Sequence, residues 1–555
     1  MASKVQIGSA RQLFLDNHVI DSVERVQRRC HRPTRELNHP VISADTPLEK
    51  NGNGPFLFGG TVIFDEEDHI FKMWYRHTDI LEKAPEGMRD VIAEDGTISR
   101  RSWIDKPGLF KALYATSKDG IHWEKPNLGI VEHNGSKNNN ILPSGTGGKD
   151  ILRRPALIKD YEEPDPSKKY KMAYVDQVQG QWSLEQAYSK DGVNWHMGAG
   201  APAHFEQPIV PHGAFFGWDP LNKLWVHFSK KLGKRRLDID GRMTGGLQSI
   251  CRSTSPDFEH WGNTEEVITP QDSDPQFWSP GSHAILSAML YTDDLFIGIS
   301  DTTPARSSED VPPGLEDVIG SHDPGHFSEL FYSRDGIQWH RAAPFFEFLP
   351  PGLWGTWDSE LVICSKPMVH NNEIYFYYSG NNLKCDAHIP DHPQNHLLRT
   401  NVNGIKSGYG IGLAKMRLDG FVSIDGYDDG GTLTTKPLIF EGDRLVVNVR
   451  APEKAHTDVI NPVTPFGSLD VELLTENGEV LAEYSKADCD TYTGDNIQHT
   501  VTWNANSNVG QLVGKPVRIR FYLKNTALYS FHFREERAPQ NLSNPGEPGS
   551  RGWPY

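Results

Sequence analysis

A seven-residue pattern, Ser-basic-Asp-Gly-x-x-Trp, occurs three times in this chain and constrains its fold more than any other feature. The copies span residues 117–123, 189–195 and 333–339, and each follows an alternating strand that ends in tyrosine. An Asp-Gly pair between a β-rich run and a tryptophan is a strong signal for a β-hairpin. Because the hairpin recurs, we expect the architecture to be built from repeated units.

Each hairpin extends towards the N-terminus into a unit of four short strands. Two weaker copies complete the series, at residues 255–261, where the glycine is lost, and at 419–421. The five hairpin aspartates are 66 to 84 residues apart, which leaves room for four strands and long insertions. Four-stranded sheets repeated radially form a β-propeller, so we predict an all-β fold with a five-bladed propeller over residues 1–430. A sandwich of unrelated hairpins is the alternative.

The pattern changes at about residue 431. The runs 444–450, 467–474 and 517–521 alternate polar and apolar residues without the hairpin motif. They predict a second domain, a β-sandwich over residues 431–535. Residues 536–555 are rich in Pro, Gly and Asn and are predicted to form an extended tail.

Charge and hydropathy argue against two kinds of partner. The formal net charge is −17, whereas binding to nucleic acid requires a basic face. No run of about 18 apolar residues exists, so we expect no membrane partner. Five cysteines without metal-ligand spacing and a start without an apolar signal segment predict a cytoplasmic protein. The location would be periplasmic or secreted if a signal had been removed, and homo-oligomerisation is left open.

The sequence resembles the five-bladed glycoside hydrolases of family 32 and its relatives. The resemblance is carried by the hairpins, by the closing run 411–423 and by the following sandwich, with Asp-Cys-Asp at 488–490 and Val-Thr-Trp at 501–503. The resemblance covers roughly residues 10–535 and implies a glycosidase that binds carbohydrate in a central pocket, without a cofactor. The three family 32 catalytic motifs, Trp-Met-Asn-Asp-Pro-Asn, Arg-Asp-Pro and Glu-Cys, are absent as such. The resemblance therefore implies a sister family whose glycosidic specificity is undefined.

Candidate catalytic residues are sought where the first strand of each blade begins, because the innermost strands of a propeller line its axis. Glycoside hydrolysis usually needs one protonated carboxyl as acid and one ionised carboxyl as nucleophile or base. We predict that Glu49, Asp150 and Glu360 are catalytic. Glu360 precedes an apolar strand beside a tryptophan, which favours the protonated form of an acid. Asp150 precedes two arginines, which favour the ionised form.

Each of these carboxylates also has a structural interpretation, as a rim residue, a loop cap or a member of an ion pair. Asp65, Asp160 and Asp219 follow the first strands of their units, and we assign them to turns.

Sugar rings stack on aromatic side chains, and their hydroxyls need hydrogen-bonding partners. The predicted substrate-binding residues are Arg153, Arg154, Asp274, Trp278, Trp357, Asp358 and His388. His388 lies in a His-rich loop whose prolines, Pro390 and Pro393, oppose a regular helix. We therefore predict a hydrogen-bonding role for this loop and no metal.

The leading functional hypothesis is a glycoside hydrolase, with transglycosylation as a related outcome. A non-catalytic carbohydrate-binding propeller and a polysaccharide lyase are the alternatives. The sugar, the linkage and the stereochemical outcome stay open.

Overall fold

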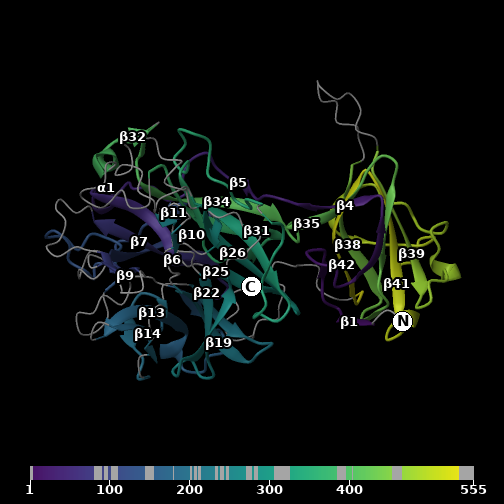
Figure 1. Ribbon diagram of the computed structural model, residues 1–555, viewed down its shortest axis with the longest axis horizontal. Coiled ribbons are helices and arrows are strands. Elements are labelled where there is room, and N and C mark those ends of the chain that lie inside the picture. The colour runs from purple at the N-terminus through teal and green to yellow at the C-terminus, as the bar shows by residue number, and fades with distance from the viewer. Residues whose placement is uncertain are drawn as a thin grey trace.

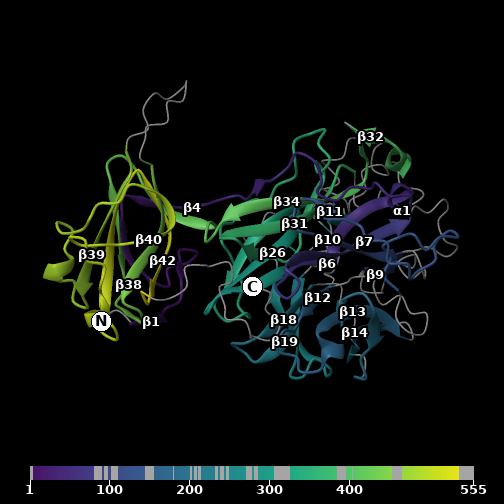
Figure 2. The ribbon, with the colours of Figure 1, turned by 180° about the vertical axis from the view of Figure 1, so that it is seen from behind.

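The fold was examined in a computed structural model of the chain. The structure describes residues 4–79, 90–92, 98–101, 110–143, 156–178, 181–200, 203–204, 209–210, 214–231, 236–237, 243–244, 249–269, 278–280, 286–304, 326–344, 346–383, 395–402, 404–452 and 466–536. In Figure 1 a group of radially arranged sheets lies beside a separate layered β-domain, and Figure 2 shows the same two parts from behind.

Five sheets form the five blades of a propeller, as predicted. Blade 1 is β6 (Gly52–Asp65), β7 (Ile70–Asp79), β10 (Phe110–Ser117) and β11 (Trp123–Glu124). Blade 2 is β12 (Leu157–Lys159), β13 (Tyr170–Val178), β14 (Gln181–Ser189) and β15 (Trp195–Met197), with β16 (Ala203–His204) at its side. Blade 3 is β17 (Ile209–Val210), β18 (Phe215–Asp219), β19 (Leu224–Lys231), β22 (Ser249–Ser255) and β23 (Gly262–Ile268).

Blades 4 and 5 follow the same order of strands. Blade 4 is β24 (Trp278–Pro280), β25 (Leu286–Thr292), β26 (Leu295–Pro304), β27 (Phe327–Ser333) and β28 (His340–Arg341). Blade 5 is β29 (Leu361–Cys364), β30 (Met368–His370), β31 (Glu373–Asn381), β34 (Tyr409–Arg417) and β5 (Thr34–Arg35). Its outermost strand, β5, comes from the N-terminal part of the chain and pairs with β34, so the ring is closed by residues far apart in sequence.

The recurring hairpin is a self-contained turn. In its first copy, Ser117 Oγ accepts the Gly120 N–H at 2.9 Å and Asp119 Oδ1 accepts the N–H of Ile121 and His122, each at 2.8 Å. Trp123 Nε1 then donates to the Gly120 carbonyl at 3.0 Å. The second and fourth copies repeat these bonds with the same partners. The sequence motif is therefore a set of local hydrogen bonds that closes the outer hairpin of a blade.

In two copies the hairpin glycine also docks on the preceding blade. Tyr377 of blade 5 donates to the Gly120 carbonyl of blade 1 at 2.7 Å, and Trp74 of blade 1 donates to the Gly192 carbonyl of blade 2 at 2.6 Å. Gly192 has φ +75°, and a Cβ added there would lie 2.6 Å from the Trp74 ring. In the third copy Phe258 takes this position at φ +70°, an uncommon conformation for a bulky residue. Its buried ring packs on Tyr188.

Replacing Gly192 by alanine is expected to lower the free energy of unfolding by about 2–4 kcal/mol, from backbone strain plus overpacking against Trp74. Gly129 is the matched control, because it has φ +67° but nothing within 4 Å of an added Cβ. Gly129→Ala should cost only about 1 kcal/mol. Urea unfolding of both variants measures the difference, and equal losses would contradict the docking argument.

The three turn aspartates are in the predicted turns. Asp65, Asp160 and Asp219 each accept the N–H two residues further along at 3.1 Å. Asp65 also accepts Lys72 and Lys159 at 2.6 Å, so a buried ion network joins blade 1 to blade 2.

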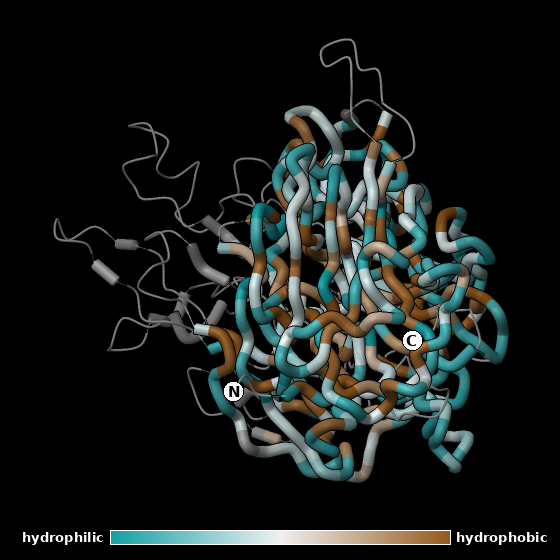
Figure 3. Tube along the Cα trace, turned by 90° about the vertical axis from the view of Figure 1, so that its right-hand side faces the viewer, coloured by the Kyte–Doolittle hydropathy of each residue, from teal (hydrophilic) through white to brown (hydrophobic). Residues whose placement is uncertain are grey.

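The second domain consists of two six-stranded sheets that enclose an apolar core. One sheet contains β37 (Leu438–Phe440), β41 (Val517–Lys524), β36 (Gly431–Thr435) and β39 (Ser468–Thr475), and the other contains β35 (Val422–Gly426), β42 (Thr526–Arg534), β38 (Arg444–Ala451) and β40 (Gly494–Thr500). Phe521 of the first sheet meets Phe531 of the second, with ring centroids 5.5 Å apart. Apolar residues run through the strands while the peripheral loops are mostly hydrophilic (Figure 3).

The N-terminal strands differ from the predicted domain boundaries. β1 (Val5–Gly8), β2 (Gln12–Leu13), β3 (Ile20–Glu24) and β4 (Val26–Cys30) pair with sandwich strands and not with the propeller. The purple N-terminal segment then crosses to β5 of blade 5 (Figure 1). β35 likewise joins the sandwich, so the chain enters the propeller after residue 30 and leaves it before residue 422. Among the described residues, none of the helices is long and apolar enough to cross a membrane.

A buried carboxylate ties the propeller to the sandwich. Asp419, in the turn after β34, accepts Tyr291 of blade 4 at 2.8 Å and Arg11 at 3.1 Å, and its second oxygen accepts Ser530 of β42 at 2.5 Å. Both Asp419 and Arg11 are buried. This one side chain therefore joins two blades, the N-terminal segment and the sandwich.

Candidate active site at the propeller axis

The two ends of the propeller differ in how they are built. The Ser-Asp-Gly-Trp hairpins and the first turn of each blade lie at one end, as the pairing of Ser117 with Trp123 and of Asp65 with Ile70 shows. The opposite end carries the starts of the first strands, where Gly52 pairs with Asp79 and Leu361 with Asn381. The long connections between the second and third strands of blades 1, 3, 4 and 5 leave from this second end, which we call the insertion end.

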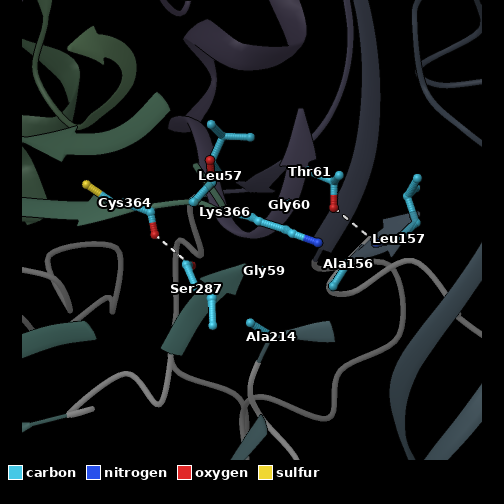
Figure 4. A pocket seen from close by; sticks show the side chains of 12 residues that line it. Leu57, Gly59, Gly60, Thr61, Ala156, Leu157, Ala214, Ser287, Cys364 and Lys366 are labelled. Atoms are coloured by element: carbon cyan, nitrogen blue, oxygen red, sulfur yellow. Dashed lines mark hydrogen bonds between the residues drawn. The ribbon is translucent and has the colours of Figure 1, made fainter. Parts of the chain in front are cut away.

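A narrow axial cavity is lined by residues from all five blades. Its lining includes Thr61 of blade 1, Leu157 of blade 2, Ala214 of blade 3, Ser287 of blade 4 and Lys366 of blade 5 (Figure 4). Thr61 Oγ1 accepts the Leu157 N–H at 3.0 Å, and Ser287 Oγ donates to the Cys364 carbonyl at 3.0 Å, so blade 1 is joined to blade 2 and blade 4 to blade 5 at the cavity. The cavity holds only one or two water molecules, and a larger ligand must sit towards an end of the axis.

Lys366 is the charged side chain of this lining. It extends across the cavity in Figure 4 and donates from Nζ to the Phe216 carbonyl of blade 3 at 2.9 Å. Burial lowers the pKa of its ammonium to about 7, because the low-dielectric surroundings disfavour the charged form. An amine that titrates near neutrality therefore lies on the propeller axis.

Glu360 directly precedes β29 (Leu361–Cys364), the innermost strand of blade 5. Its main chain is fixed on both sides, because its N–H donates to the Asn381 carbonyl at 2.9 Å and its carbonyl accepts the His326 N–H at 3.0 Å. Its side chain is partly exposed. The next residues form β29, which ends at Cys364, and Cys364 lines the cavity together with Ser365 and Lys366, which follow the strand. Glu360 therefore lies at the insertion end, one residue before the innermost strand of blade 5, and its catalytic role stays a prediction.

A buried histidine–aspartate pair adjoins Glu360. His326 and Asp301 of blade 4 are both buried, with His326 Nδ1 3.8 Å from an Asp301 oxygen. The main chain of His326 bridges to Leu361. The pair therefore lies at the boundary between blades 4 and 5, next to the predicted acid.

Glu49 lies elsewhere, in a closed network. It is the third residue of a capping box in the short helix α1 (Pro47–Lys50) and is completely buried. Its oxygens accept Thr46 Oγ1 at 2.7 Å, Tyr75 at 2.9 Å and Lys125 Nζ at 2.7 Å. These bonds use both carboxylate oxygens, so in this arrangement Glu49 fixes the start of blade 1 and does not face the axial cavity.

Two of the predicted substrate-binding residues are also used by the scaffold. Asp358 is buried and accepts Arg35 of β5 at 2.7 Å and Tyr378 at 3.0 Å, which anchors the strand that closes the ring. Trp357 stacks on Tyr378, with centroids 5.6 Å apart and ring planes at 20°, and only 5% of it is exposed. Because Trp357 is packed inside blade 5, it offers no open face to a sugar ring, contrary to the prediction.

The remaining predicted residues fall outside the described part of the chain. They are Asp150, Arg153, Arg154, Asp274 and His388. Trp278 is in β24, of which the structure describes the backbone alone. In the described ranges no three His, Cys, Asp or Glu side chains are grouped to hold a metal ion.

Lys366 is the functional candidate that sequence reasoning missed. Its signal was present, since it is the single charged residue in the otherwise apolar or small run 361–369. A charge inside such a run marks a position where a buried side chain needs a specific partner.

Comparisons with known proteins give fold-level similarity. No protein-family model and no curated protein matches the chain. A β-1,2-mannobiose phosphorylase from Listeria innocua is 10% identical, with 70% of this chain and 97% of that one covered at a TM-score of 0.39. A glycosyl hydrolase from Bacteroides ovatus is 15% identical, with 69% of this chain and 93% of that one covered at a TM-score of 0.37. An N-acetylgalactosamine deacetylase from F. plautii is also 15% identical, with 71% of this chain and 96% of that one covered at a TM-score of 0.37. At such low scores, the similarity does not assign the activity of any of these proteins to this chain.

Proposed function

We propose that this chain is a carbohydrate-active enzyme that hydrolyses a glycosidic bond at the insertion end of the propeller axis. The observation that carries the proposal is the position of Glu360, a partly exposed residue whose backbone is held by two hydrogen bonds at the start of β29, the strand that leads to the cavity lined by all five blades. The other two carboxylates that sequence reasoning placed at blade 1 and blade 5, Glu49 and Asp358, are used in buried bonds. We assign the general acid to Glu360 because it directly precedes the innermost strand of blade 5.

Asp150 is our second carboxyl. It precedes Ala156 and Leu157, which line the axial cavity, by six and seven residues. Its assignment rests on the two arginines that follow it in the sequence, Arg153 and Arg154, which favour the ionised form that a base or nucleophile needs. The separation of the two carboxyls decides between a retaining and an inverting reaction.

The test is a screen of the full chain against aryl glycosides and plant or algal oligosaccharides in ¹⁸O-labelled water. Hydrolysis adds one oxygen atom from water to the new reducing end at each cleaved bond. We therefore expect one ¹⁸O atom at each new reducing end. Cleavage that leaves an unsaturated sugar identifies a lyase, and cleavage that requires phosphate identifies a phosphorylase. Either result would overturn the proposal.

A non-catalytic carbohydrate-binding propeller is the second candidate. It is favoured by one observation, that the axial lining in the described residues contains a lysine and no carboxylate. Tight binding of an oligosaccharide without turnover in the same screen would select this function.

A further inference from the structure

A cation lies in the corner between blade 5 and blade 1, at the insertion end. Lys406 belongs to the small hairpin of β32 (Asn401–Val402) and β33 (Ile405–Lys406), which lies above blade 5 near α1 (Figure 1). Its Nζ donates to the carbonyl of Gly52, the first residue of β6, at 2.7 Å and to the carbonyl of Ser407 at 3.2 Å. Both acceptors are main-chain carbonyls, and no described carboxylate forms an ion pair with Lys406.

Several buried lysines elsewhere in the molecule are paired with carboxylates. Lys72 is 2.6 Å from Asp65, Lys171 is 2.8 Å from Asp160, and Lys125 is 2.7 Å from Glu49. The chain has a net charge of −17, so acidic residues are plentiful. Lys406 differs from these three lysines and, like Lys366 and Lys436, donates to main-chain carbonyls.

The surroundings of Lys406 favour binding of an anion. Burial lowers the pKa of its ammonium to about 8, and the nearby positive charge of Arg399 acts in the same direction. A buried ammonium that has only carbonyl partners and a second cation nearby lacks a counter-charge. A bound carboxylate would supply that charge and would form charge-assisted hydrogen bonds.

This corner is continuous with Glu360. A Cβ added at Gly408 would lie 2.7 Å from the Asn53 carbonyl, and one added at Gly54 would lie even closer to the Tyr409 carbonyl, so the chain after the Lys406 hairpin and the start of β6 pack closely together. Tyr409 pairs with Asn381, whose carbonyl accepts the Glu360 N–H. A ligand group held by Lys406 can therefore belong to the same molecule that reaches Glu360.

Two further polar atoms in the corner have unmet hydrogen-bonding capacity. Asn53 Oδ1 and Asn381 Nδ2 are buried and have no hydrogen-bond partner among the residues that the structure describes. One is an acceptor and the other a donor, which suits bridging water around a polar ligand.

We propose that Lys406, with Arg399 beside it, binds the carboxylate of an acidic sugar residue, so that the substrate class is a uronic-acid-containing glycan. The proposal rests on the function proposed above and specifies its substrate.

Calorimetric titration tests the proposal with trisaccharides of galacturonate and of glucuronate, each as the free acid and as the methyl ester. We expect the wild-type protein to bind at least one free acid about tenfold or more tightly than its ester. Lys406→Met should abolish that preference, whereas Lys406→Arg should retain it. Lys190→Met is the matched control, since Lys190 is exposed in a hairpin at the opposite end and the same charge is lost.

The preference should also depend on pH in a defined direction. The ammonium of free Lys406 is the binding form, so the preference is full below pH 8 and falls as the pH rises through and above about 8. Lys190→Met should show the same profile as the wild type.

Equal affinity for acid and ester, or a preference that survives in Lys406→Met, would overturn this inference. So would Lys406-dependent binding of inorganic phosphate without any preference for uronate, because the anion would then be free phosphate. Hydrolysis of neutral glycans without an acid preference would overturn the inference and leave the proposed function intact. Acid-specific, Lys406-dependent binding without turnover would support the inference and overturn the hydrolase.

Discussion

Replacing Glu360 by glutamine is expected to lower kcat by about 10²–10⁴-fold, the usual contribution of a positioned general acid. Glutamine has the same shape and cannot donate a proton from a carboxyl. The backbone bonds of residue 360 to Asn381 and His326 do not involve the side chain, so its position should be retained. Oligosaccharide affinity, measured by calorimetry, should change by less than about threefold.

The leaving group distinguishes an acid from a nucleophile at this position. A dinitrophenyl glycoside departs without protonation, so Glu360→Gln should lose little activity on it and much on an oligosaccharide. Glu373→Gln is the matched control, because Glu373 is in the same blade at the hairpin end, its side chain is 46% exposed, and it lies 3.8 Å from Lys415. Near-normal kcat of Glu360→Gln on an oligosaccharide would remove Glu360 from the acid role.

Replacing Asp419 by asparagine is expected to lower the free energy of unfolding by about 3–5 kcal/mol, because it leaves Arg11 as a buried, unpaired charge. Asparagine suits the backbone, since Asp419 has φ +58° and asparagine tolerates this left-handed conformation. The loss should therefore come from the bonds to Arg11, Tyr291 and Ser530.

Urea unfolding followed by tryptophan fluorescence and by circular dichroism measures this loss. The double variant Arg11→Met with Asp419→Asn is the control, because it removes both charges and should recover part of the stability. A loss below about 1 kcal/mol in Asp419→Asn would show that the contact between propeller and sandwich does not depend on this carboxylate. Separate transitions by the two probes would indicate that the two domains unfold independently.

The hairpins were predictable from the sequence because their determinants are local. The hydrogen bonds of the first hairpin join residues at most six positions apart, between Ser117, Asp119, Gly120 and Trp123. The sequence motif therefore directly predicts the turn. The number of blades follows from counting such turns. The third copy could be counted although its glycine is replaced, because Asp257 and Trp261 retain their bonds.

The candidate site was only partly predictable. Glu360 was found because the start of an innermost strand can be located by counting strands. Glu49 occupies an equivalent position by the same count, yet Lys125, 76 residues away, and Tyr75, 26 residues away, bond to its carboxylate. The sequence does not show which distant residues will bind a carboxylate and so hold it away from the propeller axis.

The sequence by itself determined the all-β class, the five units, their hairpin ends and the change of pattern to a sandwich, because these depend on turn chemistry and alternation over a few residues. Only the tertiary structure decided how the ring closes, with β5 beside β34, and that the strands of residues 5–30 belong to the sandwich. It also decided that Asp358 and Trp357 support the scaffold and that Lys366 lies on the axis. The reason is that each of these outcomes depends on which distant side chain comes within about 3–6 Å, and burial then makes that pairing obligatory.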